Sequence, residues 1–167
     1  METMWAPWRS SYVTNIASKE EGKTKRGCVF CSALEAENDL DRFIIHRSEN
    51  AFVILNLYPY NNGHMLVIPN QHVSTLDELD RSVLHELMDL VVKAQHVLLQ
   101  TYSPQGINVG LNMGSAAGAG IDQHLHFHVL PRWSADSNFM TTVGKTRVIP
   151  ESLDESWRKI RENWDKS

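Results

Sequence analysis

The segment His124-Leu125-His126-Phe127-His128-Val129-Leu130-Pro131-Arg132 carries three histidines that alternate with apolar residues. On a helix these imidazoles would point in three directions. On a β-strand they would share one face at spacings of about 6.7 Å, since each residue advances the chain by about 3.3 Å. The apolar residues between them would then line the opposite face and bury it. The pattern therefore predicts a strand with a core on one side and an exposed row of histidines on the other.

Such a row of histidines indicates function rather than stability. If the imidazoles were protonated, each would repel its neighbours, so an exposed row adds nothing to the fold. A neutral imidazole is a nucleophile, and an adjacent one can donate a hydrogen bond to an anionic substrate. The small residues of the loop Asn112–Gly120 come just before the row. Their backbone amides could approach a phosphate group closely.

The rest of the chain predicts an antiparallel sheet packed with helices. From Leu76 to Leu98, apolar residues recur at three- and four-residue steps, which indicates a long amphipathic helix. Either Thr75 with Glu78 or Asp80 could cap its start. Further strands are predicted at 43–45, 51–55, 64–68 and 107–111, helices at 28–37 and 151–164, and an irregular segment at 134–144. Three strands, the long helix and two strands together predict an α+β fold on a five-stranded antiparallel sheet.

Composition limits the class of protein. The 167 residues suit one domain, and 42% hydrophobic with 22% charged residues is ordinary for a globular protein. A net charge of −4 favours neither a nucleic-acid partner nor a membrane surface. The N-terminus lacks the apolar core of a secretory signal, and no apolar run approaches a membrane span. We therefore expect a cytoplasmic protein without a nucleic-acid or membrane partner.

The two cysteines, Cys28 and Cys31, are too close together to staple a fold. Their spacing indicates a metal site or a redox pair in a reducing compartment. Thiolates at this spacing suit zinc but need two more ligands. A thioredoxin-type redox pair would open a helix within a parallel βαβ unit, and that context is missing.

The histidine segment resembles the motif of the histidine-triad family of nucleotidyl hydrolases and transferases. Asn56, the run Asn62-Xaa-His64-Met-Leu-Val-Ile-Pro69 and the run Asn112-Xaa-Gly114 through Gly118 resemble the same family in order and spacing. This resemblance covers about residues 28–133. Trp5-Ala-Pro-Trp8 and the segment 132–139 resemble the bacterial diadenosine tetraphosphate phosphorylase branch of that family. The resemblance as a whole implies one domain over 1–167, with a core at 28–133, an N-terminal arm at 1–27 and a C-terminal extension at 134–167.

The resemblance also implies roles for individual residues. His126 would attack the α-phosphorus of a nucleotide and form a nucleotidyl-histidine intermediate. His128 would hydrogen-bond a phosphate oxygen and stabilise the developing charge. Asn56 would bind the ribose hydroxyls, although by itself it would be interpreted as a turn cap. The phosphate-binding groups would be Asn112 and the loop residues Ser115, Gly118, Ala119 and Gly120.

By the same resemblance, zinc-containing members of the family complete their metal site with two histidines. Those positions correspond to His72 and His124 here, which implies a structural zinc site formed by Cys28, Cys31, His72 and His124. His46 and His64 are the alternative ligands, and His64 is otherwise interpreted as a structural residue of its strand. His85 and His96 are interpreted as surface residues of the long helix.

The resemblance implies a homodimeric enzyme that cleaves dinucleoside polyphosphates such as diadenosine tetraphosphate. Inorganic phosphate as the acceptor would make it a phosphorylase. Water as the acceptor would make it a hydrolase of the same substrates, or of nucleoside phosphoramidates and adenylates. A nucleotide-binding regulatory module is the alternative from another class of protein. A zinc-dependent nucleic-acid-binding module is disfavoured, because no stripe of basic residues is present.

Overall fold

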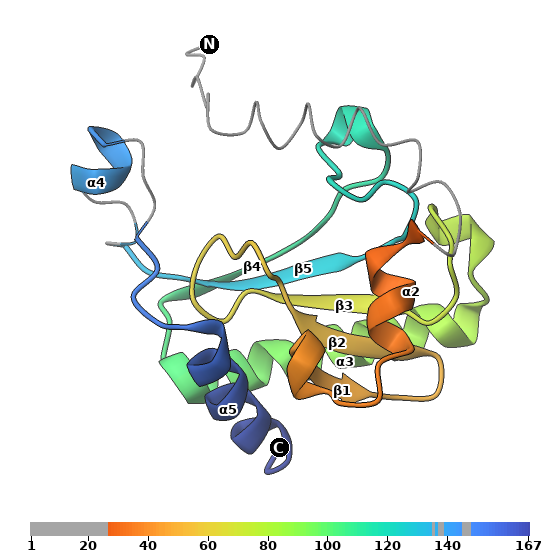
Figure 1. Cartoon of the computed structure of the whole chain (residues 1–167), viewed down its shortest axis with the longest axis horizontal. Helices are drawn as coiled ribbons and strands as arrows, with labels where there is room; N and C mark the ends of the chain where they lie inside the picture. The colour runs from red at the N-terminus through yellow and green to blue at the C-terminus, as the bar shows by residue number, and fades with distance from the viewer. Residues whose placement is uncertain (1–26, 135, 137–138, 145–147) are drawn as a thin grey trace.

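The computed structural model describes residues 27–134, 136, 139–144 and 148–167. Its five strands form one antiparallel sheet, as the sequence predicts, and they lie in the order β1-β2-β3-β5-β4 (Figure 1). The strands are β1 (Ile44–Arg47), β2 (Ala51–Leu55), β3 (Met65–Pro69), β4 (Gly106–Leu111) and β5 (Phe127–Arg132). The helices are α2 (Val29–Leu34), α3 (Arg81–Tyr102), α4 (Phe139–Thr142) and α5 (Leu153–Trp164).

Both faces of the sheet are covered, by different helices (Figure 1). On β2, Val53 faces the core formed with α3 and α5, whereas Phe52 and Ile54 face the smaller core formed with α2. Successive side chains of a strand point to opposite faces, so a strand buried on both faces is apolar throughout. This explains why every residue of β2 and β3 is buried.

The long helix α3 starts later than the apolar repeat predicts. Leu76–Glu78 instead forms a separate 3-10 turn, in which the Glu78 carboxylate accepts hydrogen bonds from the N–H groups of Ser74 and Thr75, both at 2.9 Å. Asp80 is the residue before α3, so the helix starts at the later of the two predicted positions.

Gly63 lets a preceding loop lie against this helix. Its φ is +72°, and a Cβ there would come within 2.6 Å of the Tyr102 ring.

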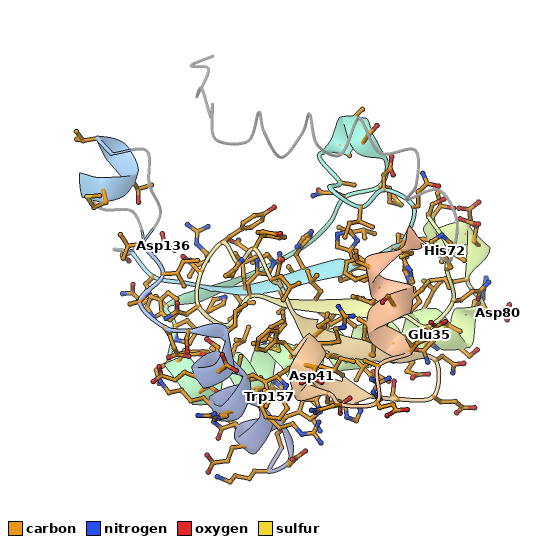
Figure 2. The ribbon with its side chains drawn as sticks, viewed as in Figure 1. Glu35, Asp41, His72, Asp80, Asp136 and Trp157 are labelled. Atoms are coloured by element: carbon orange, nitrogen blue, oxygen red, sulfur yellow. The ribbon has the colours of Figure 1, made fainter. Side chains whose placement is uncertain are left out.

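The C-terminal helix α5, predicted at 151–164, packs one face against the main core. Ile160 and Trp164 are fully buried in the main core, and Leu153 and Trp157 pack against it. Trp157 also donates its indole N–H to the carbonyl oxygen of Ile44 at 2.8 Å (Figure 2). This helix therefore covers β1, the edge strand farthest from β4.

The segment with the three histidines departs from the prediction in two respects. Regular strand pairing begins only at Phe127, so His124 and His126 precede β5. Two of the three histidines are also closed to solvent, since only 1% of His124 and 5% of His126 is exposed, whereas His128 is half-buried. The physical reason is α2, whose Phe30 ring lies 5.5 Å from the His124 ring and 5.1 Å from the His126 ring. The opposite face is as predicted, with Leu125 and Val129 in the main core.

Two other predictions concern the ends of the chain. The segment 134–144, expected to be irregular, contains the single-turn helix α4. The N-terminal arm with Trp5 and Trp8 lies outside the described residues. In the described part of the chain, none of the helices has both the length and the apolar composition that crossing a bilayer requires.

Candidate active site and metal cluster

The start of β5, helix α2 and the loop after β3 converge on one face of the sheet. Register explains part of this convergence, because His128 on β5 pairs directly with Leu66 on β3, and Leu66 packs in the core beneath α2. All three histidines therefore lie on the α2 side. His72, in the loop after β3, reaches the same region beside the start of α2 (Figure 2).

Two cysteines and two histidines form a compact cluster at this point. The His124 Nδ1 atom lies 3.3 Å from Cys28 Sγ and 3.6 Å from Cys31 Sγ. The His72 Nδ1 atom lies 3.4 Å from Cys31 Sγ and 3.3 Å from His124 Nδ1. All four ligand atoms lie within 4.8 Å of one another. The structure thus brings together the four residues proposed as metal ligands.

These separations fit a tetrahedral zinc ion. Zn–N distances near 2.05 Å and Zn–S distances near 2.3 Å place two nitrogens about 3.3 Å apart, and a nitrogen and a sulfur about 3.5 Å apart. The His124 Nε2–H group donates to the carbonyl oxygen of Pro69 at 2.9 Å, which leaves the Nδ1 lone pair directed at the cluster. Burial lowers the pKa of His124 to about 4, so its imidazole is neutral at pH 7 and able to bind a metal.

The second histidine of the segment has its tautomer set by the backbone. The Nδ1–H group of His126 donates to the carbonyl oxygen of His124 at 2.8 Å. The lone pair is therefore on Nε2, the atom on the far side of the ring. Burial also lowers the pKa of His126, which keeps the ring neutral at pH 7. A neutral imidazole with its Nε2 lone pair available can act as a nucleophile.

The third histidine belongs to a chain of hydrogen bonds that begins at a backbone amide. The Tyr60 N–H group donates to His64 Nδ1 at 3.1 Å, so the His64 proton is on Nε2. His64 Nε2 in turn lies 2.9 Å from His128 Nδ1 and donates to it. Burial lowers the pKa of His128 to about 4, so this ring is neutral and its proton is on Nε2. His126 and His128, 5.0 Å apart between ring centroids, therefore offer complementary Nε2 groups, a lone pair and a donor.

His64 lies outside the metal cluster and contacts the third histidine of the segment. It was interpreted as a structural residue of the third strand, but it lies just before β3 and is hydrogen-bonded to His128. In the sequence, His64 follows Asn56 by eight residues, and both belong to the segments that resemble the family. This resemblance does not reveal which imidazole His64 contacts, because the contact depends on how β3 and β5 align.

Asn56 has a turn-capping role in the structure. Its Oδ1 atom accepts a hydrogen bond from the Tyr58 N–H group at 3.0 Å. This bond identifies the other amide atom as Nδ2, which lies 3.3 Å from His64 Nδ1. Asn56 therefore adds a second donor toward His64 Nδ1. Its contact with a ribose stays a prediction.

The loop after β4 contains a 3-10 turn at Ser115–Ala117 between two glycines with positive φ, 78° at Gly114 and 91° at Gly118. The Gly118 N–H group donates to the carbonyl oxygen of Ser115 at 3.0 Å, and the Ala119 N–H group to that of Gly114 at 3.4 Å. Two of the amides predicted to bind phosphate therefore also hold the turn together. Asn112 lies at the base of this loop, and Gly120 follows the turn.

Space for a ligand lies beside the histidines. Gly110 on β4 pairs directly with His128, and a Cβ built on Gly110 would have no atom within 4 Å. Since paired residues point to the same face, this space borders His128.

The three remaining histidines, His46, His85 and His96, lie away from this site. His46 packs against Trp164 with ring centroids 5.4 Å apart, and His85 and His96 are exposed on α3, as predicted.

The fold and the site together define an α+β protein with three histidines on one face of an antiparallel sheet, next to a glycine-containing loop and a Cys2His2 cluster. A family model, the HIT domain, matches residues 37–135. The chain belongs to this family, which confirms the histidine-triad resemblance noted in the sequence.

Individual relatives extend the comparison over nearly the whole chain. An AP-4-A phosphorylase of Mycobacterium tuberculosis is 34% identical over 165 residues, which are 98% of this chain and 85% of that protein. A solved hypothetical histidine triad nucleotide-binding protein of Sulfolobus tokodaii superposes with a TM-score of 0.69 at 29% identity, covering 83% of this chain and 93% of its own. A zinc-bound histidine triad family protein of Mycobacterium smegmatis gives a TM-score of 0.70 at 26% identity, covering 86% and 96%.

Proposed function

We propose that this protein is a nucleotidyl transferase that cleaves dinucleoside polyphosphates, with diadenosine tetraphosphate as substrate and inorganic phosphate as acceptor. The observation that carries the proposal is the pair of neutral imidazoles, His126 buried and His128 half-buried, with opposite Nε2 roles, a lone pair on His126 and a donor on His128. The similarity to an AP-4-A phosphorylase over 98% of the chain supports the choice of substrate and acceptor.

In the proposed mechanism, the His126 Nε2 lone pair attacks an α-phosphorus. A P–N bond forms, the bond to the bridging oxygen breaks, and ATP leaves with that electron pair. The His128 Nε2–H group donates to a phosphate oxygen and stabilises the charge that develops there. An oxygen of inorganic phosphate then attacks the same phosphorus, the P–N bond breaks, and ADP leaves with free His126 restored. The two displacements replace a single, more difficult one.

The supporting contacts in this mechanism come from the two loops beside the triad. Asn56, at the end of β2, binds the ribose of the transferred nucleotide. The phosphate oxygens are bound by Asn112 and the loop residues Ser115, Gly118, Ala119 and Gly120. The positive φ values at Gly114 and Gly118 support this role, because they hold the turn in a shape that brings backbone close to a ligand.

The Cys28, Cys31, His72 and His124 cluster is proposed to hold one structural zinc ion. The tetrahedral separations of its ligand atoms support this, as does the zinc-bound relative from Mycobacterium smegmatis. Cys28 and Cys31 are buried and not joined in a disulfide, and they must stay reduced to bind a metal, which supports a cytoplasmic location. With four protein ligands the ion would have no open position, so it would stabilise the site rather than react in it.

The products of diadenosine tetraphosphate cleavage test the acceptor. With inorganic phosphate present, we expect equal amounts of ATP and ADP, because phosphate captures the adenylyl group from His126. Without phosphate, turnover should be slow and yield ATP and AMP, since water is then the acceptor. Ion-exchange chromatography of the quenched reaction separates the three nucleotides. ATP and AMP at full rate under both conditions would identify a hydrolase instead.

We further propose that the chain forms a homodimer through the β4 edge of its sheet. Among the described strands, β4 pairs with β5 alone, and its Val109 side chain is 46% exposed. An unpaired apolar edge is the usual place for a second copy to add. Sedimentation velocity should give about twice the mass of one chain, and Val109→Lys should shift the protein toward the monomer. A monomeric wild-type protein would contradict the proposal.

A further inference from the structure

We propose that Tyr60 is a positioning residue for His128. Its backbone N–H group and its ring together hold the His64–His128 pair so that the Nε2–H group of His128 faces the substrate. This inference rests on the proposed function for its catalytic consequence. The arrangement of Tyr60 and the two imidazoles itself does not depend on which substrate the protein cleaves.

The backbone of Tyr60 decides where the protons of this pair lie. Its N–H group, 3.1 Å from His64 Nδ1, faces an atom that must accept. A proton on that nitrogen would put two donors in contact, so the Nδ1–H tautomer of His64 is disfavoured. His64 must then donate from Nε2 to His128 Nδ1. One amide thereby sets the proton on His128 Nε2, two rings away.

The side chain of Tyr60 covers the same pair. Its ring lies 4.8 Å from the His64 ring, and 6.1 Å from the His128 ring at an interplanar angle of 19°. With 40% of its surface exposed, Tyr60 forms the solvent side of this stack. Water that reached the hydrogen bond between the imidazoles would compete for both nitrogens and loosen the orientation of His128. The aromatic ring excludes water and limits rotation of both imidazoles.

The loop that carries Tyr60 is held at both ends of the turn. The adjacent Asn61 is buried, and its Nδ2 group donates to the carbonyl oxygen of Pro131 at 3.1 Å and to Asp136 Oδ2 at 2.9 Å. Asp136, beyond the C-terminal end of β5 (Figure 2), is itself bound by Arg132 at 2.6 Å. Gly63 then fits the chain against Tyr102 on α3. These contacts fix the Tyr60 ring relative to the strand that carries His128.

Three variants separate the ring from a general effect of the loop. Tyr60→Ala removes the ring, Tyr60→Phe keeps it without the hydroxyl, and Tyr60→Leu keeps apolar bulk without a flat face. Tyr58→Ala is the matched control, because Tyr58 lies in the same loop with 73% of its surface exposed. With diadenosine tetraphosphate as substrate, kcat should fall by about tenfold to about a hundredfold in Tyr60→Ala, with KM changing less than about threefold. Tyr60→Phe should retain the activity of the wild type and Tyr60→Leu should lose activity as Tyr60→Ala does. Tyr58→Ala should match the wild type.

Nuclear magnetic resonance provides the readout that does not depend on activity. In substrate-free protein with 15N-labelled histidine, long-range 1H–15N spectra should show His64 and His128 both protonated on Nε2. The hydrogen-bonded His64 Nε2–H signal should be protected from exchange with water in the wild type and in Tyr60→Phe. It should broaden beyond detection in Tyr60→Ala and Tyr60→Leu.

The two readouts distinguish failure of this inference from failure of the proposed function. An unchanged His64 Nε2–H signal in Tyr60→Ala, or the opposite tautomer of His128 in the wild type, would overturn the positioning role. A wild-type protein that leaves diadenosine tetraphosphate intact would overturn the proposed function, and the spectra would still decide the role of Tyr60.

Discussion

Replacing His126 by asparagine is expected to lower kcat for diadenosine tetraphosphate cleavage by about four orders of magnitude or more. Loss of a covalent nucleophile typically has an effect of this size, since binding and electrostatic stabilisation alone remain. Asparagine can still donate to the carbonyl oxygen of His124, the present partner of His126 Nδ1. The variant therefore removes the Nε2 lone pair without emptying the site. Initial rates of ATP release measure the effect.

Trapping the intermediate makes this test specific. Wild-type protein quenched during turnover of substrate labelled at the α-phosphorus should retain label that is stable in base and released by acid, as expected of a P–N bond. His126→Asn should retain none, whereas His85→Ala, on the exposed face of α3, should behave as the wild type. Label bound equally by His126→Asn would assign the covalent step to another residue. Nucleotide binding without any trapped label would favour a regulatory binding module.

The second large effect is expected at the metal cluster. Cys31→Ser should abolish binding of one zinc ion per chain and lower the melting temperature by roughly 10 °C or more. A closed zinc site contributes several kcal/mol to folding, and each kcal/mol corresponds to about 2–4 °C for a chain of this size. Elemental analysis and scanning calorimetry measure the two changes. Ser32→Ala, an exposed change on the same helix α2, should alter neither.

Activity should also fall when zinc is lost, although no ligand of the cluster is proposed to touch the substrate. His124 connects the two sites, because its Nδ1 atom lies in the cluster and its carbonyl oxygen accepts the hydrogen bond from His126 Nδ1. Without the metal this carbonyl is held less firmly, and the expected loss in kcat for Cys31→Ser is about tenfold to about a hundredfold. Full stability and full activity in a zinc-free Cys31→Ser variant would exclude a structural metal here.

The sequence by itself determined the order of the elements and the chemistry of the central strand. The period-2 alternation in His124–Arg132 and the period-3.6 repeat of the long helix are local signals, and they lead to β5 from Phe127 and to α3 from Arg81. The strand predicted at 51–55 coincides with β2, because its run of apolar residues ends in polar residues on both sides. Such patterns are read from neighbours in the chain, so tertiary packing need not be known.

Tertiary structure alone decided which groups meet. Two histidines of the row predicted to be exposed, His124 and His126, are buried because Phe30 of α2, about a hundred residues away in sequence, packs over them. The His64–His128 contact depends on the pairing of Leu66 with His128, a register between strands that are not consecutive in the chain. Register and layer packing are set by the fit of whole faces, which no local pattern encodes. The triad that first reads as three equivalent histidines is thereby divided, with His124 in the metal cluster, His126 holding a free lone pair and His128 a directed proton.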